Sequence, residues 1–163
     1  MSPEGWHPKG WKKIGPSVPK KHRARMFSLC EVIKTWSACP KGRQHACVLT
    51  EKGKYIVSTG YNGVPAGKLC KILTTCDGMY REDMYKSCKA IHAEINALNN
   101  LVYGVPEKCI AFVSKRPCAA CMKALKDAGV HEVYWLEYAK NIPGHIIDQG
   151  SKELAHYDPK TGR

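Results

Sequence analysis

Hydrophobic residues recur at the spacing of an α-helix in three stretches of the chain. The first covers residues 23–38, and its apolar stripe consists of Met26, Leu29, Cys30, Ile33 and Trp36. The second covers residues 90–102, with a stripe of Ile91, Ile95 and Leu98. The third covers residues 117–129, where Pro117 suits the first helical turn and Gly129 the helix end. These patterns predict three amphipathic helices, each with one buried face.

Short runs of β-branched and aromatic residues separate these helices. Residues 45–50 and 54–62 are two such runs, and Gly53 between them predicts a hairpin turn. Residues 109–113 (CIAFV) and 131–138 (HEVYWLEY) predict two further strands. The order helix, hairpin, helix, strand, helix, strand predicts an α/β fold, in which helices cover both faces of a mixed sheet.

Two segments have a weaker pattern. Residues 63–87 combine glycines, a proline and cysteines with little periodicity, which predicts a long loop. Loops of this length in compact domains are either functional or disordered, so the cysteines indicate that something holds the loop in place. Residues 146–157 (IIDQGSKELAHY) are expected to form a short helix.

A length of 163 residues, with 44% hydrophobic and 25% charged residues, is typical of one globular domain. Residues 1–22 are rich in Pro, Gly and basic residues, so we expect an extended basic arm followed by a single domain at residues 23–163. No apolar run has the length of a bilayer span or of a signal peptide, so we expect a soluble, cytoplasmic protein without membrane contact.

The net charge of +12 would suit a polyanionic partner. Residues 1–25, however, carry seven Lys or Arg residues against one Glu, which is half of the net charge. This distribution favours a solvated tail over a specific binding element. A nucleic-acid partner bound through the arm is an alternative rather than the expectation.

Nine cysteines without a secretion signal favour metal ligation or buried thiols over disulfides. Cys118 and Cys121 are three residues apart at the start of a predicted helix, where they share a face and the helix dipole should lower their thiol pKa. Together with His92 they supply three zinc ligands. Tetrahedral zinc with three protein ligands keeps one position open for water, so we expect a catalytic zinc ion.

Glu94 follows His92 by two residues, where its carboxylate could take a proton from that water and deliver it to the substrate. The pattern H-x-E followed by P-C-x-x-C is the signature of zinc-dependent deaminases. The alternative is a solvated helix face for His92 and Glu94, with two buried structural thiols in the C-x-x-C pair.

Three further segments resemble the deoxycytidylate (dCMP) deaminase family, in particular its phage-type members. They are STGYNGVPAG at 58–67, TWSAC at 35–39 and YWLEYAKNIPG at 134–144. The resemblance covers about residues 24–150 and implies a three-layer α/β/α cytidine-deaminase-like fold with a central mixed five-stranded sheet. It also implies hydrolysis of dCMP to dUMP and ammonia in pyrimidine deoxynucleotide metabolism, a zinc cofactor, and a homo-oligomer, either a hexamer or a dimer.

The family pattern implies a role for each residue at a motif position. Zinc would be held by His92, Cys118 and Cys121, and Glu94 would carry the proton. Substrate contacts would come from Asn62 at the sugar, Ala46 at the base, Tyr138 beside the substrate, and Lys41 and Arg43 at the phosphate. Some members are regulated by deoxynucleoside triphosphates bound near the GYNG segment, so such an effector is a further candidate partner.

Two departures from the family pattern concern substrate choice. His45 stands where members usually have glycine, and it adds bulk where the backbone should run close to the base. Lys115 and Arg116 replace the usual small or apolar residues before the second zinc motif. They could contact the phosphate, or they could lie at the rim of the pocket without contacting the substrate.

A second, structural zinc is a further hypothesis, because some family members hold one with a similar cysteine set. The corresponding residues are Cys70, Cys76 and Cys88, with Cys39 as a candidate fourth ligand. Four thiolates would close the site and order the long loop. The alternative is a flexible insert with unpaired thiols. Three other cysteines are expected as small apolar core residues: Cys30, Cys47 and Cys109.

Three other functions stay open. The first is a deaminase of tRNA adenosine or single-stranded DNA cytidine, which the charge and Trp6 and Trp11 would suit, although the GYNG segment argues against it. The second is a deaminase of a modified dCMP or of dCTP. The third is a non-catalytic zinc module that binds nucleic acid. Glu94 argues against the third, because a structural site has no need of a carboxylate beside an open position.

Overall fold

The computed structural model describes residues 12–13, 17–39, 43–65, 90–102, 106–136 and 153–158, the first and last of these through the backbone alone. The helices are α1 (Lys20–Lys34), α2 (Ala93–Asn99) and α3 (Ala119–Ala128), with a 3-10 turn at Pro106–Lys108. The strands are β1 (Lys12–Lys13), β2 (Ala46–Glu51), β3 (Tyr55–Tyr61), β4 (Cys109–Val113), β5 (Glu132–Leu136) and β6 (Glu153–Asp158). None of the described helices combines the length and the apolar character that crossing a bilayer requires.

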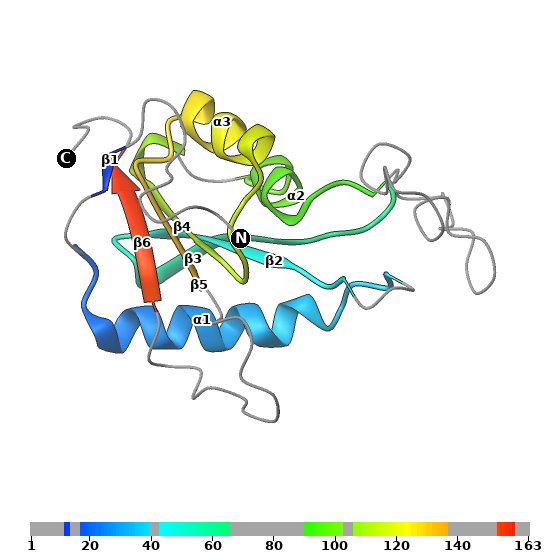
Figure 1. Ribbon diagram of the computed structural model, residues 1–163, viewed down its shortest axis with the longest axis horizontal. Helices are drawn as coiled ribbons and strands as arrows, with labels where there is room; N and C mark the ends of the chain where they lie inside the picture. Colours follow the sequence, from blue (N-terminus) through cyan, green and yellow to red (C-terminus); the bar gives the residue numbers. More distant parts are fainter. Residues whose placement is uncertain are drawn as a thin grey trace.

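The strands form one sheet in the order β1-β6-β5-β4-β2-β3 (Figure 1). β4 and β5 are parallel, whereas all other neighbours are antiparallel. The expected α/β fold with a mixed sheet is therefore confirmed. The expected count of five strands differs from the structure: β2 to β5 are the four strands with described side chains, and β6 and the two-residue β1 extend the sheet to six.

β6 corrects the expectation of a short helix over residues 146–157. Residues 153–158 form a strand that pairs antiparallel with β5, with Val133 opposite Tyr157. Without this partner, one edge of β5 would present unpaired backbone donors and acceptors, so pairing with β6 satisfies groups that a helix would leave open. The remainder of the expected helix, residues 146–152, lies outside the described residues.

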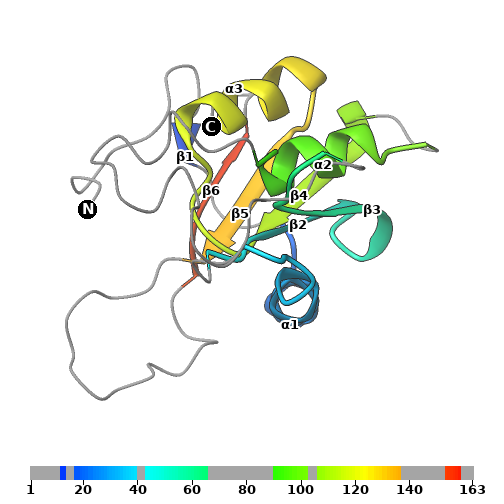
Figure 2. The ribbon, with the colours of Figure 1, turned by 90° about the vertical axis from the view of Figure 1, so that its right-hand side faces the viewer.

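Side chains alternate between the two faces of the sheet, and each face has its own core. On β2, Ala46 and Val48 belong to the apolar cluster packed against α1. Cys47 and Leu49 belong to the cluster packed against α2 and α3. Figures 1 and 2 show α1 on one side of the sheet and the other two helices on the opposite side, which confirms the expected covering of both faces. The thiols expected in the core are buried: Cys30, Cys47 and Cys109.

The start of α1 is fixed to β5. The Tyr134 hydroxyl accepts hydrogen bonds from the backbone N–H groups of Ser17 and Val18, each at 3.1 Å. Val18 is buried, and the helix begins at Lys20 rather than at residue 23. Residues 17–22 are therefore part of the folded unit. Beyond this, the division into a basic arm and one domain stays a prediction.

The buried stripe of α1 agrees with the sequence pattern except at its end. Met26, Cys30 and Ile33 are buried, but Trp36 is 56% exposed. The helix ends at Lys34, so Trp36 lies in the following turn and no longer shares the helical face. Phe27 contributes the additional buried ring on this face.

α2 packs on β3 through small residues rather than through the expected stripe. Ile91, Ile95 and Leu98 are only partly buried. The cause is Gly60 of β3: a Cβ added there would lie 2.3 Å from the nitrogen of Ala97 and 2.4 Å from the oxygen of Ala93. Helix and strand are in backbone contact at this point, so only small side chains fit between them.

Two side-chain amides of α2 strengthen this contact. Asn96 donates a hydrogen bond to the carbonyl of Tyr61 at 2.8 Å, and Asn100 donates one to the carbonyl of Thr59 at 3.0 Å. β3 is the outer strand of the sheet. These bonds therefore satisfy carbonyl groups that no neighbouring strand reaches.

Gly60→Ala should lower the free energy of unfolding by about 1–3 kcal/mol, because the backbone of α2 must move to admit the methyl group. Gly63→Ala is the matched control, since no atom lies within 4 Å of its added Cβ, and its effect should stay within about 0.5 kcal/mol. Urea denaturation of both variants measures the difference. Equal stabilities would contradict the close contact.

Candidate active site

Two helix N-termini bring the expected zinc ligands together on one face of the sheet. His92 is the N-cap residue of α2, Cys118 is that of α3, and Cys121 lies in the first turn of α3. The Nδ1 atom of His92 lies 3.6 Å from Sγ of Cys118 and 3.3 Å from Sγ of Cys121. All three ligand atoms lie within 4.8 Å of one another, so one metal ion could bind all of them.

Backbone contacts fix the position of each ligand. Gly63 and Ile91 exchange two backbone hydrogen bonds, at 3.1 and 2.7 Å, which hold the residue before His92 against the chain that follows β3. His92 has an extended backbone (φ −67°, ψ 153°) just before the helix begins. Cys118 is similarly extended, and its Sγ accepts a hydrogen bond from the N–H of Cys121 at 3.5 Å. The metal ligands therefore lie at the starts of two helices, where hydrogen bonds to the backbone fix their positions.

The ionisation of Cys121 corrects one expectation. The sequence predicts a lowered thiol pKa at this helix start, but the pKa of Cys121 is raised, first by burial and then by the charges of Glu94 and Cys118. Loss of hydration outweighs the helix dipole here. A thiolate at this place needs a cation beside it, which is what a divalent metal supplies. The donor set of one imidazole and two sulfurs therefore fits zinc.

Glu94 lies in the first turn of α2 and is only 6% exposed. Burial raises the pKa of its carboxyl, while hydrogen bonds, including one with Cys121, and the charge of His92 act in the opposite direction. Glu94 is therefore not part of a solvated helix face. A buried carboxyl with a raised pKa holds its proton closer to neutral pH, which suits proton transfer.

Asn62 is buried, and both ends of its side chain bind backbone. Its Oδ1 accepts a hydrogen bond from the N–H of His45 at 2.8 Å, and its Nδ2 donates one to the carbonyl of Arg43 at 2.6 Å. Asn62 thus fixes the segment that leads into β2. The expected contact between Asn62 and a nucleotide sugar stays a prediction.

Ala46 is fully buried, with its side chain on the α1 face. Its N–H donates to the hydroxyl of Ser114 at 2.9 Å, and its carbonyl accepts from the N–H of Ser114 at 3.0 Å. The roles of Ala46 at the base and of Arg43 at the phosphate stay predictions, and Tyr138 and Lys41 lie outside the described residues. Ser114 was not among the residues predicted from the sequence. The sequence signal for Ser114 is its position as a single polar residue directly after the apolar run CIAFV.

The second metal site is not tested by the described residues. Cys39 is half-buried with a free thiol, and its backbone N–H donates to the hydroxyl of Ser37 at 3.4 Å. The other expected ligands lie outside the described residues: Cys70, Cys76 and Cys88. A structural zinc at this place therefore stays a prediction.

Residues 20–137 match the family model of the cytidine and deoxycytidylate deaminase zinc-binding region. The chain belongs to this deaminase family. The matched residues include all three helices and the strands β2 to β5, and therefore every residue of the candidate metal centre. The family expected from the sequence is confirmed.

Individual relatives of this deaminase-family chain agree with the family model. A probable deoxycytidylate deaminase of Caenorhabditis elegans is 33% identical over 123 residues, which are 72% of this chain and 58% of that protein. The deoxycytidylate deaminase of Mycobacterium phage D29 is 32% identical over 112 residues, 61% of this chain and 81% of that protein. The chain thus spans less than two thirds of the length of the nematode relative.

A solved structure shares the fold of this deaminase-family chain. The dCMP deaminase of cyanophage S-TIM5, in complex with dCMP and dUMP, is 22% identical and has a TM-score of 0.58. The comparison covers 72% of this chain and 82% of that one. The comparison shows that the two chains have the same fold.

Removal of one metal ligand should lower the zinc content by about one ion per chain, because two remaining donors bind weakly. Cys121→Ser and His92→Asn test this by elemental analysis after exhaustive dialysis. Cys109→Ala is the control, since this thiol is buried at the opposite end of β4 and should not affect the metal. Full zinc retention in the Cys121 variant would contradict the assigned ligands.

Proposed function

We propose that this protein is a zinc-dependent hydrolytic deaminase that converts dCMP to dUMP and ammonia. The observation that carries the proposal is the buried carboxyl of Glu94 beside a group of three metal ligands. Three ligands leave one tetrahedral position for solvent, as in catalytic rather than structural zinc sites. Similarity to the deoxycytidylate deaminases of a nematode and a phage supports the choice of substrate.

Zinc held by His92, Cys118 and Cys121 would supply a hydroxide nucleophile from water near neutral pH. Glu94 accepts the proton of that water and holds it on its buried carboxyl. It then protonates N3 of the cytosine while the water oxygen bonds to C4. In a second transfer, Glu94 takes the remaining hydroxyl proton from the oxygen on C4 and delivers it to the amino group, which leaves as ammonia. C4 keeps the oxygen and becomes the carbonyl of dUMP, so dCMP and water give dUMP and ammonia.

Several residues would hold the rest of the nucleotide: Asn62 at the sugar, Ala46 at the base, Tyr138 beside the substrate, and Lys41 and Arg43 at the phosphate. The hydrogen bond between Asn62 and the backbone of Arg43 supports this, because it keeps two of these residues together. Asn62 and Arg43 lie on chain segments next to the metal ligands, because Gly63, which follows Asn62, pairs with Ile91, which precedes His92.

Further parts of the proposal rest on the family likeness alone. The four cysteines at 39, 70, 76 and 88 would bind a structural zinc. The protein would act in the cytoplasm as a hexamer or dimer, with a deoxynucleoside triphosphate as effector. These points stay predictions.

A substrate panel tests the proposed reaction. The zinc-loaded protein is incubated with dCMP, dCTP, deoxycytidine and a cytosine-containing oligonucleotide, and ammonia release is measured. Turnover should be fastest with dCMP. Turnover of the oligonucleotide without turnover of dCMP would contradict the proposed substrate and favour a polynucleotide deaminase.

Glu94→Gln should reduce kcat for dCMP by about 10²–10⁴-fold, because the amide cannot carry the proton. The zinc content should stay unchanged, since Glu94 is not one of the three ligands. Glu51→Gln, at the far end of β2, is the control and should retain activity. A zinc-loaded Glu94→Gln enzyme with full activity would remove this residue from the mechanism.

A further inference from the structure

Three neighbouring chain segments meet beside the metal centre. Both backbone groups of His45 bond to Asn62: its N–H to Oδ1 at 2.8 Å, and its carbonyl to the N–H at 3.3 Å. On the other side, Ala46 and Ser114 exchange two hydrogen bonds, at 2.9 and 3.0 Å. Lys115 follows Ser114, so it lies next to His45 as the antiparallel pairing of β2 and β4 continues.

His45 lies on the face of the sheet that carries the metal ligands, and Lys115 lies close to its ring. Cys47 belongs to the core under α2 and α3, and alternation along the chain assigns His45, two residues earlier, to the same face. Lys115 lies in the bend that follows β4, and its charge is the first electrostatic cause of the lowered His45 pKa, so it lies close to the His45 ring. The effect of the His92 charge on the His45 ring agrees with this placement.

His45 is neutral at pH 7. Its pKa is lowered to about 4, first by burial and then by four nearby positive charges: Lys115, His92, Lys34 and Arg43. A neutral imidazole offers one N–H donor and one acceptor nitrogen. The ring can therefore donate a hydrogen bond to an anion without adding to the local charge.

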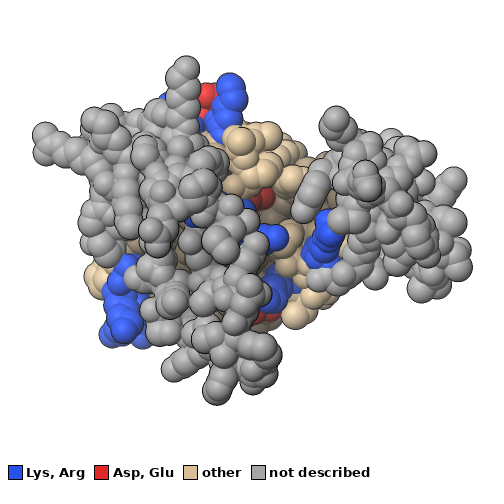
Figure 3. Space-filling view, in the orientation of Figure 1, with Lys and Arg blue, Asp and Glu red and all other residues tan. Residues whose placement is uncertain are grey.

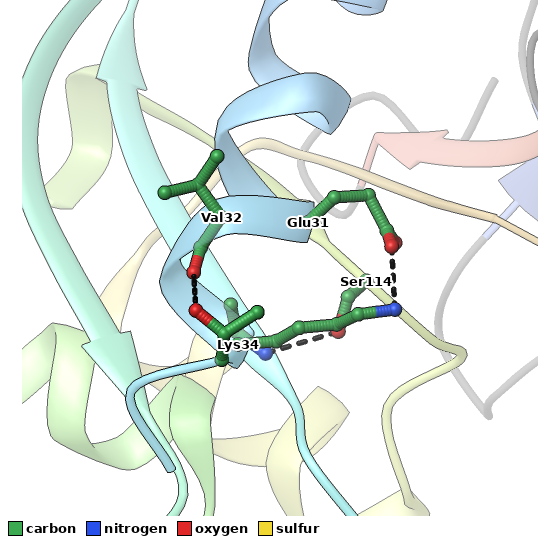
Figure 4. Close-up of polar contacts among 6 residues, drawn as sticks. Glu31, Val32, Lys34 and Ser114 are labelled. Carbon is green, nitrogen blue, oxygen red and sulfur yellow. Dashed lines mark hydrogen bonds and ion pairs between the residues drawn. The ribbon is translucent and has the colours of Figure 1, made fainter.

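Lys115 places a positive charge next to the His45 ring. Lys34 forms an ion pair with Glu31 (Figure 4). Lys115 is exposed and forms no ion pair with another residue in the described part of the chain. Lys and Arg side chains are also prominent on the described surface in Figure 3, where few acidic side chains are visible. Like charges held close together favour a bound anion.

We propose that Lys115 and His45 form a phosphate subsite that binds the 5′-phosphate of a nucleoside monophosphate. The inference rests on the proposed function, because it names residues that recognise the substrate of that reaction. Neighbouring strands lie about 4.8 Å apart, so both side chains can reach one phosphate group. Lys115 contributes a charge-assisted bond and His45 a neutral N–H bond. Both residues depart from the usual family pattern, so the subsite adds to the contacts expected from Lys41 and Arg43.

A comparison of the affinities for dUMP and for deoxyuridine, which lacks the phosphate, separates phosphate recognition from other effects. Zinc-loaded Lys115→Gln should bind dUMP about 10- to 100-fold more weakly than the parent protein does, with the affinity for deoxyuridine changed by less than about threefold. Lys115→Arg keeps the charge and should restore most of the affinity. His45→Phe keeps an aromatic ring but removes both ring nitrogens, including the N–H donor, and should weaken dUMP binding by about fivefold. Isothermal titration calorimetry measures all of these affinities.

Lys108→Gln is the matched control, because this exposed lysine lies just before the opposite end of β4 and should leave both affinities unchanged. Equal losses for dUMP and deoxyuridine in Lys115→Gln, or no loss, would overturn the subsite while leaving dCMP turnover as evidence for the proposed function. A parent protein that neither turns over dCMP nor binds dUMP would overturn both. Tighter, Lys115-dependent binding of an oligonucleotide than of dUMP would overturn the assignment to a free nucleotide.

Discussion

The backbone contact between α2 and Gly60 of β3 determines where the candidate active site lies. It holds the start of α2 beside the end of β3, so that His92 reaches the two sulfurs at the start of α3. The same helical turn carries Glu94 into the protein interior. Metal ligand and proton carrier are therefore positioned by one packing interaction, and a larger residue at position 60 would displace both together.

The second half of the site follows from the topology of the sheet. β4 and β5 are parallel neighbours, so the chain must cross over between them, and α3 provides the crossover. Its N-terminus consequently lies near the end of β4, where Ser114 bonds to the start of β2. Ligands from α2 and α3 meet beside the same strand ends that present His45 and Lys115. The metal ligands and the proposed phosphate subsite therefore lie at the same edge of the sheet.

Periodicity and spacing predicted the three helices and the strands β2 to β5, because each of these depends on residues close together in the sequence. The family was indicated by the resemblance of several short motifs. The remaining features depend on contacts between distant segments. The expected stripe of α2 is only partly buried, because Gly60 selects small residues there, although Leu98 still packs against the core. The short helix was wrong because residues 153–158 pair with β5. The raised pKa of Cys121 arises from burial, which helix position alone could not indicate.

The central claim is that one metal ion has three protein ligands and a solvent position next to Glu94. A crystal structure of the zinc-loaded protein, with the metal located by anomalous scattering, tests it most directly. We predict zinc about 2.3 Å from the sulfurs of Cys118 and Cys121, about 2.0–2.1 Å from Nδ1 of His92, and a fourth, non-protein ligand facing Glu94. A fourth protein ligand in that position, or zinc bound away from these three residues, would contradict the account.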